Sequence, residues 1–231
     1  MKLNMGVIAT GASGSIGGLT VSRNRYGFYA RARTTPVNPN TGRQMAARAR
    51  FAAAANLWSA SLTQAYRDGW QTYADAIVWK GSLGLDCKLT GFAHFLRSCT
   101  SRLCAGLFPV LPAPVLLTLP ESDPYFETTV DEAGQEISVA FDNALGWANE
   151  TGGAMLISMS SPKGEGRDYI GGPFRTAGVI LGVTGTPPTS PEVIDCPFPV
   201  AEDQKVDCIA SILRVDGRVS QPFQFTSSVT A

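Results

Sequence analysis

The feature that most constrains the fold is a change in the hydrophobic pattern near Pro109. Before it, apolar residues recur every three or four positions, as Leu62, Tyr66, Trp70 and Tyr73 do, which is the period of an amphipathic helix. After it, short β-rich runs follow one another at intervals of roughly ten residues or more, with turn-forming clusters between several of them. The sequence therefore predicts an α+β protein in which helices precede strands along the chain.

Residues 109–231 are predicted to form an all-β domain. The β-rich runs are PVLLTL, YFETTV, EISVAF, AMLISMS, TAGVILGV, VDCIASILRV and RVSQPFQFTSS. About seven strands in some 115 residues favour a sandwich, and the Asp216-Gly217 pair predicts a hairpin that joins the last two runs. The region resembles immunoglobulin-like and fibronectin type III modules, and ASILRVDGRVSQPFQFTSS is similar to the closing hairpin of the latter. This resemblance concerns the fold and implies no activity.

Residues 41–108 are predicted to form a helical domain of about three helices. The segments Thr41–Gln44 and Ser61–Gln64 fit capping boxes that open the first two helices. The third is expected in LTGFAHFLRSCTSRLCAGL, with Gly106 ending it. The first two helices are expected to pack as an antiparallel pair around five large apolar side chains. These are Phe51, Leu57, Trp58, Trp70 and Tyr73.

Residues 1–40 are predicted to form an extended basic arm that contains a β-hairpin. Two β-rich runs, Leu19–Arg23 and Phe28–Thr34, flank an N-R-Y-G turn. In the second run a period of two puts Tyr29, Arg31 and Arg33 on one face. The P-V-N-P-N segment then keeps the chain extended. Because an isolated hairpin is marginal in water, we expect the arm to gain order only by lying against another molecule.

The segment VIATGASGSIGG, at residues 7–18, looks like the phosphate-binding turn of a dinucleotide-binding fold. Such a fold requires a helix that starts within the glycines and an acidic residue about 20 positions further on. Here the glycines lead into a β-rich, arginine-rich segment, and the first acidic residue of the chain is Asp68. No nucleotide cofactor is therefore expected. The interpretation from sequence is instead that the glycines let the backbone approach a neighbour closely.

The net charge of zero hides a strong division between the two halves of the chain. Residues 1–110 hold 13 Lys/Arg and 3 acids, a balance of 13 − 3 = +10, and residues 111–231 hold 6 Lys/Arg and 16 acids, a balance of 6 − 16 = −10. The first 50 residues contain eight basic residues and no acid. This asymmetry indicates either different partners for the two halves or head-to-tail contact between copies.

The arm supplies the candidate partner-binding residues. They are Arg23, Arg25, Tyr26, Phe28, Tyr29, Arg31 and Arg33. Arginines interleaved with aromatic rings can contact phosphates and stack on bases. They can equally bind the carboxylates of another subunit, for which the acidic C-terminal half is a candidate partner. The sequence leaves both readings open.

No catalytic, metal-binding or cofactor-binding residues are predicted. The five cysteines include no C-x-x-C pair, and His94 is the single histidine, between aromatic residues where a packed side chain is expected. No triad context or pair of carboxylates suited to acid–base work stands out. The chain is expected not to be an enzyme. Neither a secretory signal nor a membrane-spanning run is evident.

The run SGSIGGLTVSRNRYGFYARARTTPVNPNTGRQMAARARF, followed by LWSASLTQAYRDGWQTYA and LTGFAHFLRSC, resembles a family of uncharacterised proteins encoded in tailed phages, prophages and some bacterial genomes. The resemblance covers residues 11–105. It implies a non-enzymatic virion structural protein, such as a capsid-decorating, neck or tail component, made in the host cytoplasm. The expected partners are other virion proteins and copies of the chain in a homo-oligomer. A nucleic-acid-binding protein and a bacterial surface or adhesion protein are the alternatives.

Overall fold

The computed structural model describes residues 13–24, 27–35, 37–80, 86–167 and 171–231. The chain divides into two compact units that meet between Met45 and Ala46, and each is described by itself. Three α-helices stand between an N-terminal sheet and the C-terminal strands, and one short strand pair lies between the second and third helices, so the mixed α+β class is confirmed. Most of the predicted helical region and all of the predicted β region belong to the one unit of residues 46–231.

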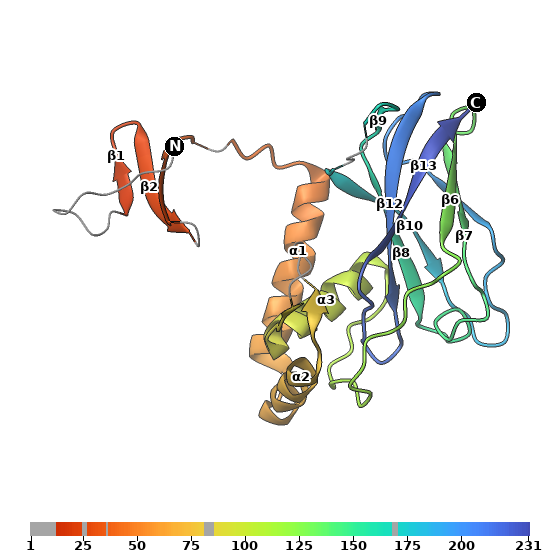
Figure 1. Ribbon diagram of the computed structural model, residues 1–231. Coiled ribbons are helices and arrows are strands. Elements are labelled where there is room, and N and C mark those ends of the chain that lie inside the picture. The colour runs from red at the N-terminus through yellow and green to blue at the C-terminus, as the bar shows by residue number, and fades with distance from the viewer. Residues whose placement is uncertain (1–12, 25–26, 36, 81–85, 168–170) are drawn as a thin grey trace. The chain divides into compact units, whose positions relative to one another are not determined.

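The N-terminal unit contains a three-stranded antiparallel sheet (Figure 1). Its strands are β1 (Gly14–Ile16), β2 (Leu19–Asn24) and β3 (Gly27–Ala32), in the order β1-β2-β3. The predicted hairpin is confirmed as β2 and β3, which pair from Leu19 opposite Ala32 to Asn24 opposite Gly27. Strand β1 was not predicted, because the glycine-rich segment before it has no strand pattern.

Three α-helices follow the arm. They are α1 (Gly42–Asn56), which continues into the π-helical turn η1 (Leu57–Ser61), α2 (Gln64–Ala76) and α3 (Gly91–Cys104). The first capping box is confirmed, since Thr41 and Gln44 each bond the other's backbone N–H at 3.4 Å. The second was misplaced. Thr63, rather than Ser61, caps α2 by accepting from the backbone N–H of Tyr66, because Ser61 still belongs to the π turn.

The predicted pairing of the first two helices is wrong, because α2 packs on α3 instead. A Cβ atom on Gly91 would lie 2.7 Å from the backbone nitrogen of Gln71, so glycine is what allows the two helices to approach this closely. Phe51, expected between α1 and α2, is 54% exposed. The apolar core under the helices consists of Ala54, Leu62, Trp70, Tyr73, Ile77, Trp79, Phe95 and Cys99. Two short paired strands, β4 (Trp79–Lys80) and β5 (Asp86–Cys87), lie between α2 and α3 in the sequence.

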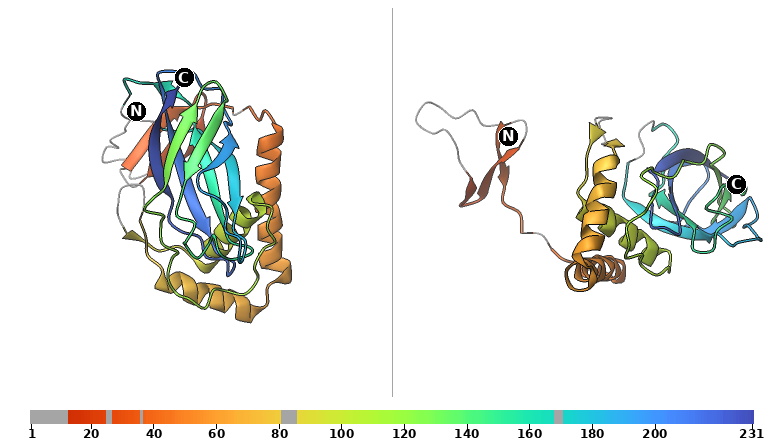
Figure 2. Two further views of the ribbon diagram at one scale, coloured as in Figure 1. Left: turned by 90° about the vertical axis from the view of Figure 1, so that its right-hand side faces the viewer. Right: turned by 90° about the horizontal axis from the view of Figure 1, so that it is seen from below.

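The C-terminal strands form one continuous sheet. They are β6 (Glu127–Asp131), β7 (Glu136–Ala140), β8 (Ala154–Ser160), β9 (Lys163–Gly164), β10 (Phe174–Leu181), β11 (Glu192–Asp195), β12 (Gln204–Leu213) and β13 (Phe223–Thr230). The order is β10-β8-β12-β13-β6-β7-β11, with β9 on β12. Only the β13–β6 pair is parallel among the described neighbours. The sheet curls into a near-barrel, as the right-hand view of Figure 2 shows, so a two-layer sandwich is not confirmed.

Six of the seven predicted β-rich runs contain strands, and the exception is PVLLTL. This segment forms no strand, and Val115 within it is 92% exposed. Prolines at 109, 112, 114 and 120 remove backbone donors there, which explains the absence of ladder pairing. The predicted Asp216-Gly217 hairpin turn is confirmed, with Gly217 at a φ of 90° that favours glycine.

A period of two gives the curled sheet an apolar inner side. The buried set includes Val130, Ile137, Val139, Met155, Ile157, Met159, Val206, Cys208, Ala210 and Ile212, together with Phe141 and Trp147. In β6 and β7 these residues alternate with side chains that are exposed or half-buried. Because side chains of a strand point alternately to its two faces, the apolar residues fill the interior and the residues between them form the outer face.

Helix α3 is attached to the strands by a buried arginine. Arg102, 5% exposed, donates from Nε to the carbonyl oxygen of Phe108 at 2.7 Å, and from Nη1 to those of Gly152 at 3.1 Å and Arg214 at 3.0 Å. Arg97 adds a bond from Nη2 to the carbonyl oxygen of Ser220 at 2.9 Å. These donors fix the helices to the β region within one compact unit.

Replacing Arg102 by alanine is expected to destabilise the fold by about 3 kcal/mol or more. Hydrogen bonds from a charged donor contribute about 1.5–3 kcal/mol, and the substitution removes three such bonds, to the carbonyl oxygens of Phe108, Gly152 and Arg214. Urea denaturation followed by tryptophan fluorescence measures the change. Arg167→Ala, at an exposed position, is the matched control and should shift stability by no more than about 0.5 kcal/mol. Equal midpoints for the two variants would contradict the role assigned to Arg102.

Candidate functional site

The structure describes five of the seven candidate partner-binding residues. Arg25 and Tyr26 lie outside the described residues, and for Phe28 only the backbone is described. Tyr29 pairs with Ser22 and Arg31 with Thr20, so Tyr29 and Arg31 share one face of β3 as predicted. Arg23 pairs with Phe28, one position out of phase, and lies on the other face. The structure therefore brings part of the candidate set together and separates Arg23 from it.

Arg33 continues the pattern just beyond the end of β3. Its backbone N–H donates to the carbonyl oxygen of Gly18 at 2.7 Å, so the pairing with β2 extends past the strand. The side chains of Arg31 and Arg33 are both exposed. Two guanidinium groups, two positions apart, are thus presented to solvent along the edge of the arm sheet.

The arm sheet has almost no interior of its own. Among the described residues of the N-terminal unit, Ala30 is the one buried side chain. Ile16 is 85% exposed and Leu19 52% exposed, although both are apolar. A fully buried leucine or isoleucine contributes about 1.5–3 kcal/mol, which these side chains do not gain within the described part of their own unit.

The described part of the glycine motif, residues 13–18, contributes to a hairpin turn. Strands β1 and β2 pair with Ile16 opposite Leu19, and Gly17 between them has a φ of 56°. A dinucleotide-binding fold would instead start a helix within its glycines. Within this chain a Cβ at Gly14, Gly17 or Gly18 would meet nothing within 4 Å, so close backbone approach to another molecule stays a prediction for these glycines. The positive φ at Gly17 explains that glycine.

Helix α1 exposes nearly all of its surface. Of its 15 residues only Ala54 is buried, and Met45 and Phe51 are both more than half exposed. Three arginines and no acid lie on it, at positions 43, 48 and 50. The basic character of the arm thus continues onto a helix with little packing of its own.

His94 is a core residue, as the sequence indicated. It is 4% exposed, and its Nε2 accepts from the indole N–H of Trp79 at 3.2 Å. Burial, with a contribution from nearby Arg97, lowers the pKa of His94 to about 4. The imidazole is therefore neutral and occupied as an acceptor. Arg97 in turn lies over the Trp79 ring, with its Cζ atom 3.9 Å from the ring centroid.

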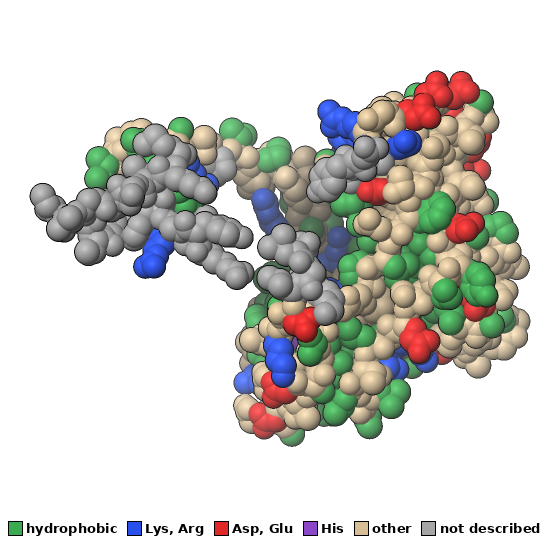
Figure 3. All heavy atoms as spheres, viewed as in Figure 1, with side chains coloured by type: hydrophobic (Ala, Val, Ile, Leu, Met, Phe, Trp, Pro, Cys, Tyr) green, Lys and Arg blue, Asp and Glu red, His purple; other side chains and the backbone are tan. Residues whose placement is uncertain are grey.

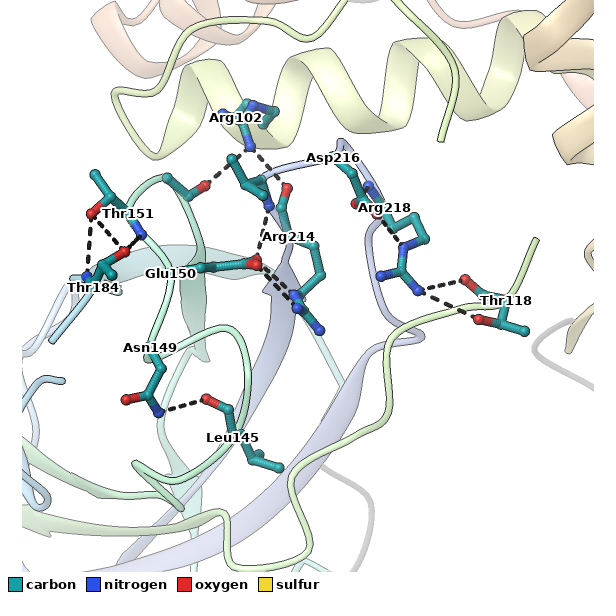
Figure 4. A network of polar contacts seen from close by, with 12 residues as sticks. Arg102, Thr118, Leu145, Asn149, Glu150, Thr151, Thr184, Arg214, Asp216 and Arg218 are labelled. Atoms are coloured by element: carbon teal, nitrogen blue, oxygen red, sulfur yellow. Dashed lines mark hydrogen bonds and ion pairs between the residues drawn. The ribbon is translucent and has the colours of Figure 1, made fainter. Parts of the chain in front are cut away.

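A polar network lies between α3 and the turn from β12 to β13 (Figure 4). Arg214 binds both carboxylate oxygens of Glu150, at 2.6 and 3.0 Å, and Arg218 binds Asp216 at 2.7 Å. Arg218 also donates to the carbonyl oxygen of Thr118 at 3.2 Å. Sequence reasoning did not single out these arginines. Asp216 is two residues from Arg218, but Glu150 is 64 residues from Arg214 and Thr118 is 100 residues from Arg218.

Arg214 and Arg218 border a cavity of about 320 Å³. Its lining also includes Leu116, Thr118, Leu119, Pro120, Glu121, Leu145, Gly146, Trp147 and Ile212. Because Arg214 is paired with Glu150 and Arg218 with Asp216, the network serves to hold the 109–126 segment and the hairpin turn in place. We therefore interpret these two ion pairs as stabilising the fold next to the turn between β12 and β13.

Within the described part of the chain, no group of three His, Cys, Asp or Glu residues is arranged to hold a metal ion. All five cysteines are free thiols. Among the described helices, none combines the length and apolar character needed to cross a membrane. A comparison with models of known protein families found no match, and a comparison with curated protein sequences found none either.

The lowered pKa of His94 predicts a loss of stability in mild acid. In the unfolded chain its pKa is near the ordinary value of 6.5, so the unfolded state binds the proton first as the pH falls. The stabilisation is complete above pH 6.5 and is lost progressively between pH 6.5 and about 4, by up to about 3 kcal/mol. Urea denaturation at a series of pH values, with the purification tag removed, measures this slope.

His94→Gln is the control, because its amide oxygen can still accept from Trp79 while it does not titrate. As His94 is the sole histidine, the variant should show a flat profile from pH 6.5 down to the range in which carboxylates begin to titrate. An identical slope in both proteins would mean that His94 is not responsible.

Proposed function

We propose that this chain is a non-enzymatic structural protein of a tailed-phage virion, a capsid-decorating, neck or tail component, that assembles through its basic arm. The observation that carries the proposal is the arm itself. Among its described residues the arm sheet has one buried side chain, Arg31 and Arg33 are exposed, and the first 50 residues of the chain contain no acid. Ordering backbone costs about 1–2 kcal/mol per residue, so such a segment needs a partner surface to offset that cost.

Helix α1 supports the same conclusion. Isolated helices of about 15 residues are marginal in water, and most helical stability comes from packing of an apolar face. In α1 that packing is restricted to Ala54, whereas Met45 and Phe51 are exposed. A helix of this kind gains stability from contact with a neighbouring molecule, which a repeating assembly supplies.

The strand order supports the finer proposal that the β region is an immunoglobulin- or fibronectin-like module. With β6, β7, β8, β11, β12 and β13 taken as strands A, B, C, E, F and G, A-B-E and C-F-G are each contiguous in the order. Immunoglobulin-type sandwiches group these strands in the same two sets, and β10 adds a strand beside C, as variable-type domains do. Such a module suits a projecting or sealing element of a particle. The resemblance of residues 11–105 to phage and prophage proteins points to the same class.

Deleting residues 1–40 is expected to leave a folded protein that fails to enter particles. Residues 46–231 form a compact unit with the two main apolar clusters, so their unfolding midpoint should be within experimental error of the full chain. Incorporation is measured by mass spectrometry of particles purified from the phage-producing strain, with the gene replaced by the truncated version. At least a tenfold drop in copy number is expected.

A matched control carries a serine/glycine linker of equal length in place of residues 1–40, which preserves chain length without the arginines. It should be as defective as the deletion. If either version enters particles at the level of the full chain, the arm is not the assembly element. If the full chain is missing from particles, the virion role itself fails.

Nucleic-acid binding is the second candidate, because Arg31 shares a face with Tyr29 and no acid lies nearby in the sequence. Phosphate contacts predict an affinity for DNA that falls steeply with salt. Neutralising the four arm arginines, Arg23, Arg25, Arg31 and Arg33, should then abolish DNA binding in fluorescence anisotropy. Binding that is weak at low salt and unchanged by the substitutions would remove this candidate.

A further inference from the structure

We propose that the outer face of strands β6, β7 and β11 is the surface on which the arm of a second copy of this chain docks. The inference rests on the proposed function, in which the arm binds a neighbouring subunit, and it names that neighbour and the face. It follows from the strand register, from the charges that this register brings together, and from the exposure of the face.

The register aligns three carboxylates in one row across the sheet. Asp131 of β6 lies opposite Glu136 of β7, and Glu136 lies opposite Asp195 of β11. The next outward row is Thr129, Ser138 and Val193. Glu127 lies beyond it, two positions before Thr129 on the same face. The outer face of these three strands thus carries four acids and no Lys or Arg.

This row is unfavourable in the isolated chain. Like charges directly opposite each other on neighbouring strands are destabilising. Within the described part of the chain, the ion pairs of the β region join Arg214 to Glu150 and Arg218 to Asp216, and none reaches Asp131, Glu136 or Asp195. The same three carboxylates, after burial, raise the pKa of the adjacent Cys196 thiol to about 11. A cationic partner would relieve the repulsion along the row.

The face is open. Glu127, Thr129, Glu136 and Asp195 are exposed, and Val193 is 53% exposed. In the left-hand view of Figure 2, β6 and β7 lie toward the viewer with no helix in front of them. The space-filling view in Figure 3 shows scattered Asp and Glu side chains on the visible side of the β region. The face therefore has room for an added layer.

The arm has the complementary charge and spacing. Residues 1–45 contain six Lys/Arg and no acid, and Arg31 and Arg33 are exposed. Two residues apart on a strand corresponds to about 7 Å, and two strand spacings span about 10 Å. The guanidinium groups of Arg31 and Arg33 can thus reach the outer carboxylates of the row together, and each can bind bidentately. Tyr29 on the same face of β3 adds a ring that can pack over Val193.

The test is a charge swap read by sedimentation velocity on the full chain. Arg31→Glu/Arg33→Glu and, separately, Glu136→Lys/Asp195→Lys should each weaken self-association at least tenfold at about 50 mM salt. Asp131 and Glu132 are left unchanged because their carboxylates hold backbone N–H groups of Gly134 and Glu202. The four-residue variant that carries both reversals should recover the association of the original chain.

Asp68→Lys/Asp75→Lys on α2 is the matched control. Both residues are exposed, and each accepts a hydrogen bond from a glutamine of the same helix. It changes the net charge by the same amount as the face variant, and association should stay within twofold of the original. Equal weakening in this control would mean that net charge, not the face, is responsible, and would overturn the proposal.

The outcomes separate the two proposals. If the arm variant loses association but the face variant does not, or if the double reversal fails to restore it, the arm docks elsewhere and this inference is wrong while the proposed function stands. If the full chain does not self-associate at low salt, the second copy is excluded as the occupant. Normal particle incorporation without residues 1–40 would instead contradict the proposed function.

Discussion

The arrangement of the larger unit depends on the burial of an arginine with no carboxylate on its guanidinium. Arg102 is held by backbone carbonyls from three separate segments: the chain after α3, the loop before β8 and the end of β12. Burial lowers its pKa, so the charge is costly to place there unless all three acceptors are present together. This requirement makes docking of the helix and closure of the strands one cooperative event.

In the strands of the β region, alternate residues face the interior and the outer surface, so the two sets of residues have separate roles. In β6 and β7 the inward residues Val130, Ile137 and Val139 are fully buried. The positions between them contribute nothing to the interior, so their identity is free to serve another purpose. The row of carboxylates across three neighbouring strands, in a chain whose first 50 residues contain eight basic residues and no acid, gives this outer surface a chemical character that packing does not require.

Local patterns predicted local structure well. The arm hairpin, the cap at Thr41, the end of α3 at Gly106 and the Asp216-Gly217 turn each depend on residues a few positions apart. The predictions were wrong where a helix packs against an element that is distant in the sequence. The choice of α3 rather than α1 as the neighbour of α2 depends on the contact that Gly91 allows, and no period in the sequence encodes it.

In the candidate site, too, features set by local sequence were predictable and features set by distant strand pairing were not. A period of two was enough to put Tyr29 and Arg31 on one face. The row of Asp131, Glu136 and Asp195 joins strands separated by about 60 residues of sequence, and its register is set by the whole sheet. Strand β11 went unrecognised because its four residues lie among turn-forming residues and prolines, so the third carboxylate of the row had no predicted strand to carry it.

The parallel pair between β13 and β6 has a consequence for how the protein is made. Val229 lies beside Val130, and β13 also pairs along β12, so this strand joins the two halves of the sheet. A growing chain presents β6 about 100 residues before its neighbour emerges from the ribosome, and the intervening loop must close late and slowly. Until then the open edge of β6 is available to other nascent chains, which makes the interval between synthesis of the two strands the period of greatest risk of aggregation.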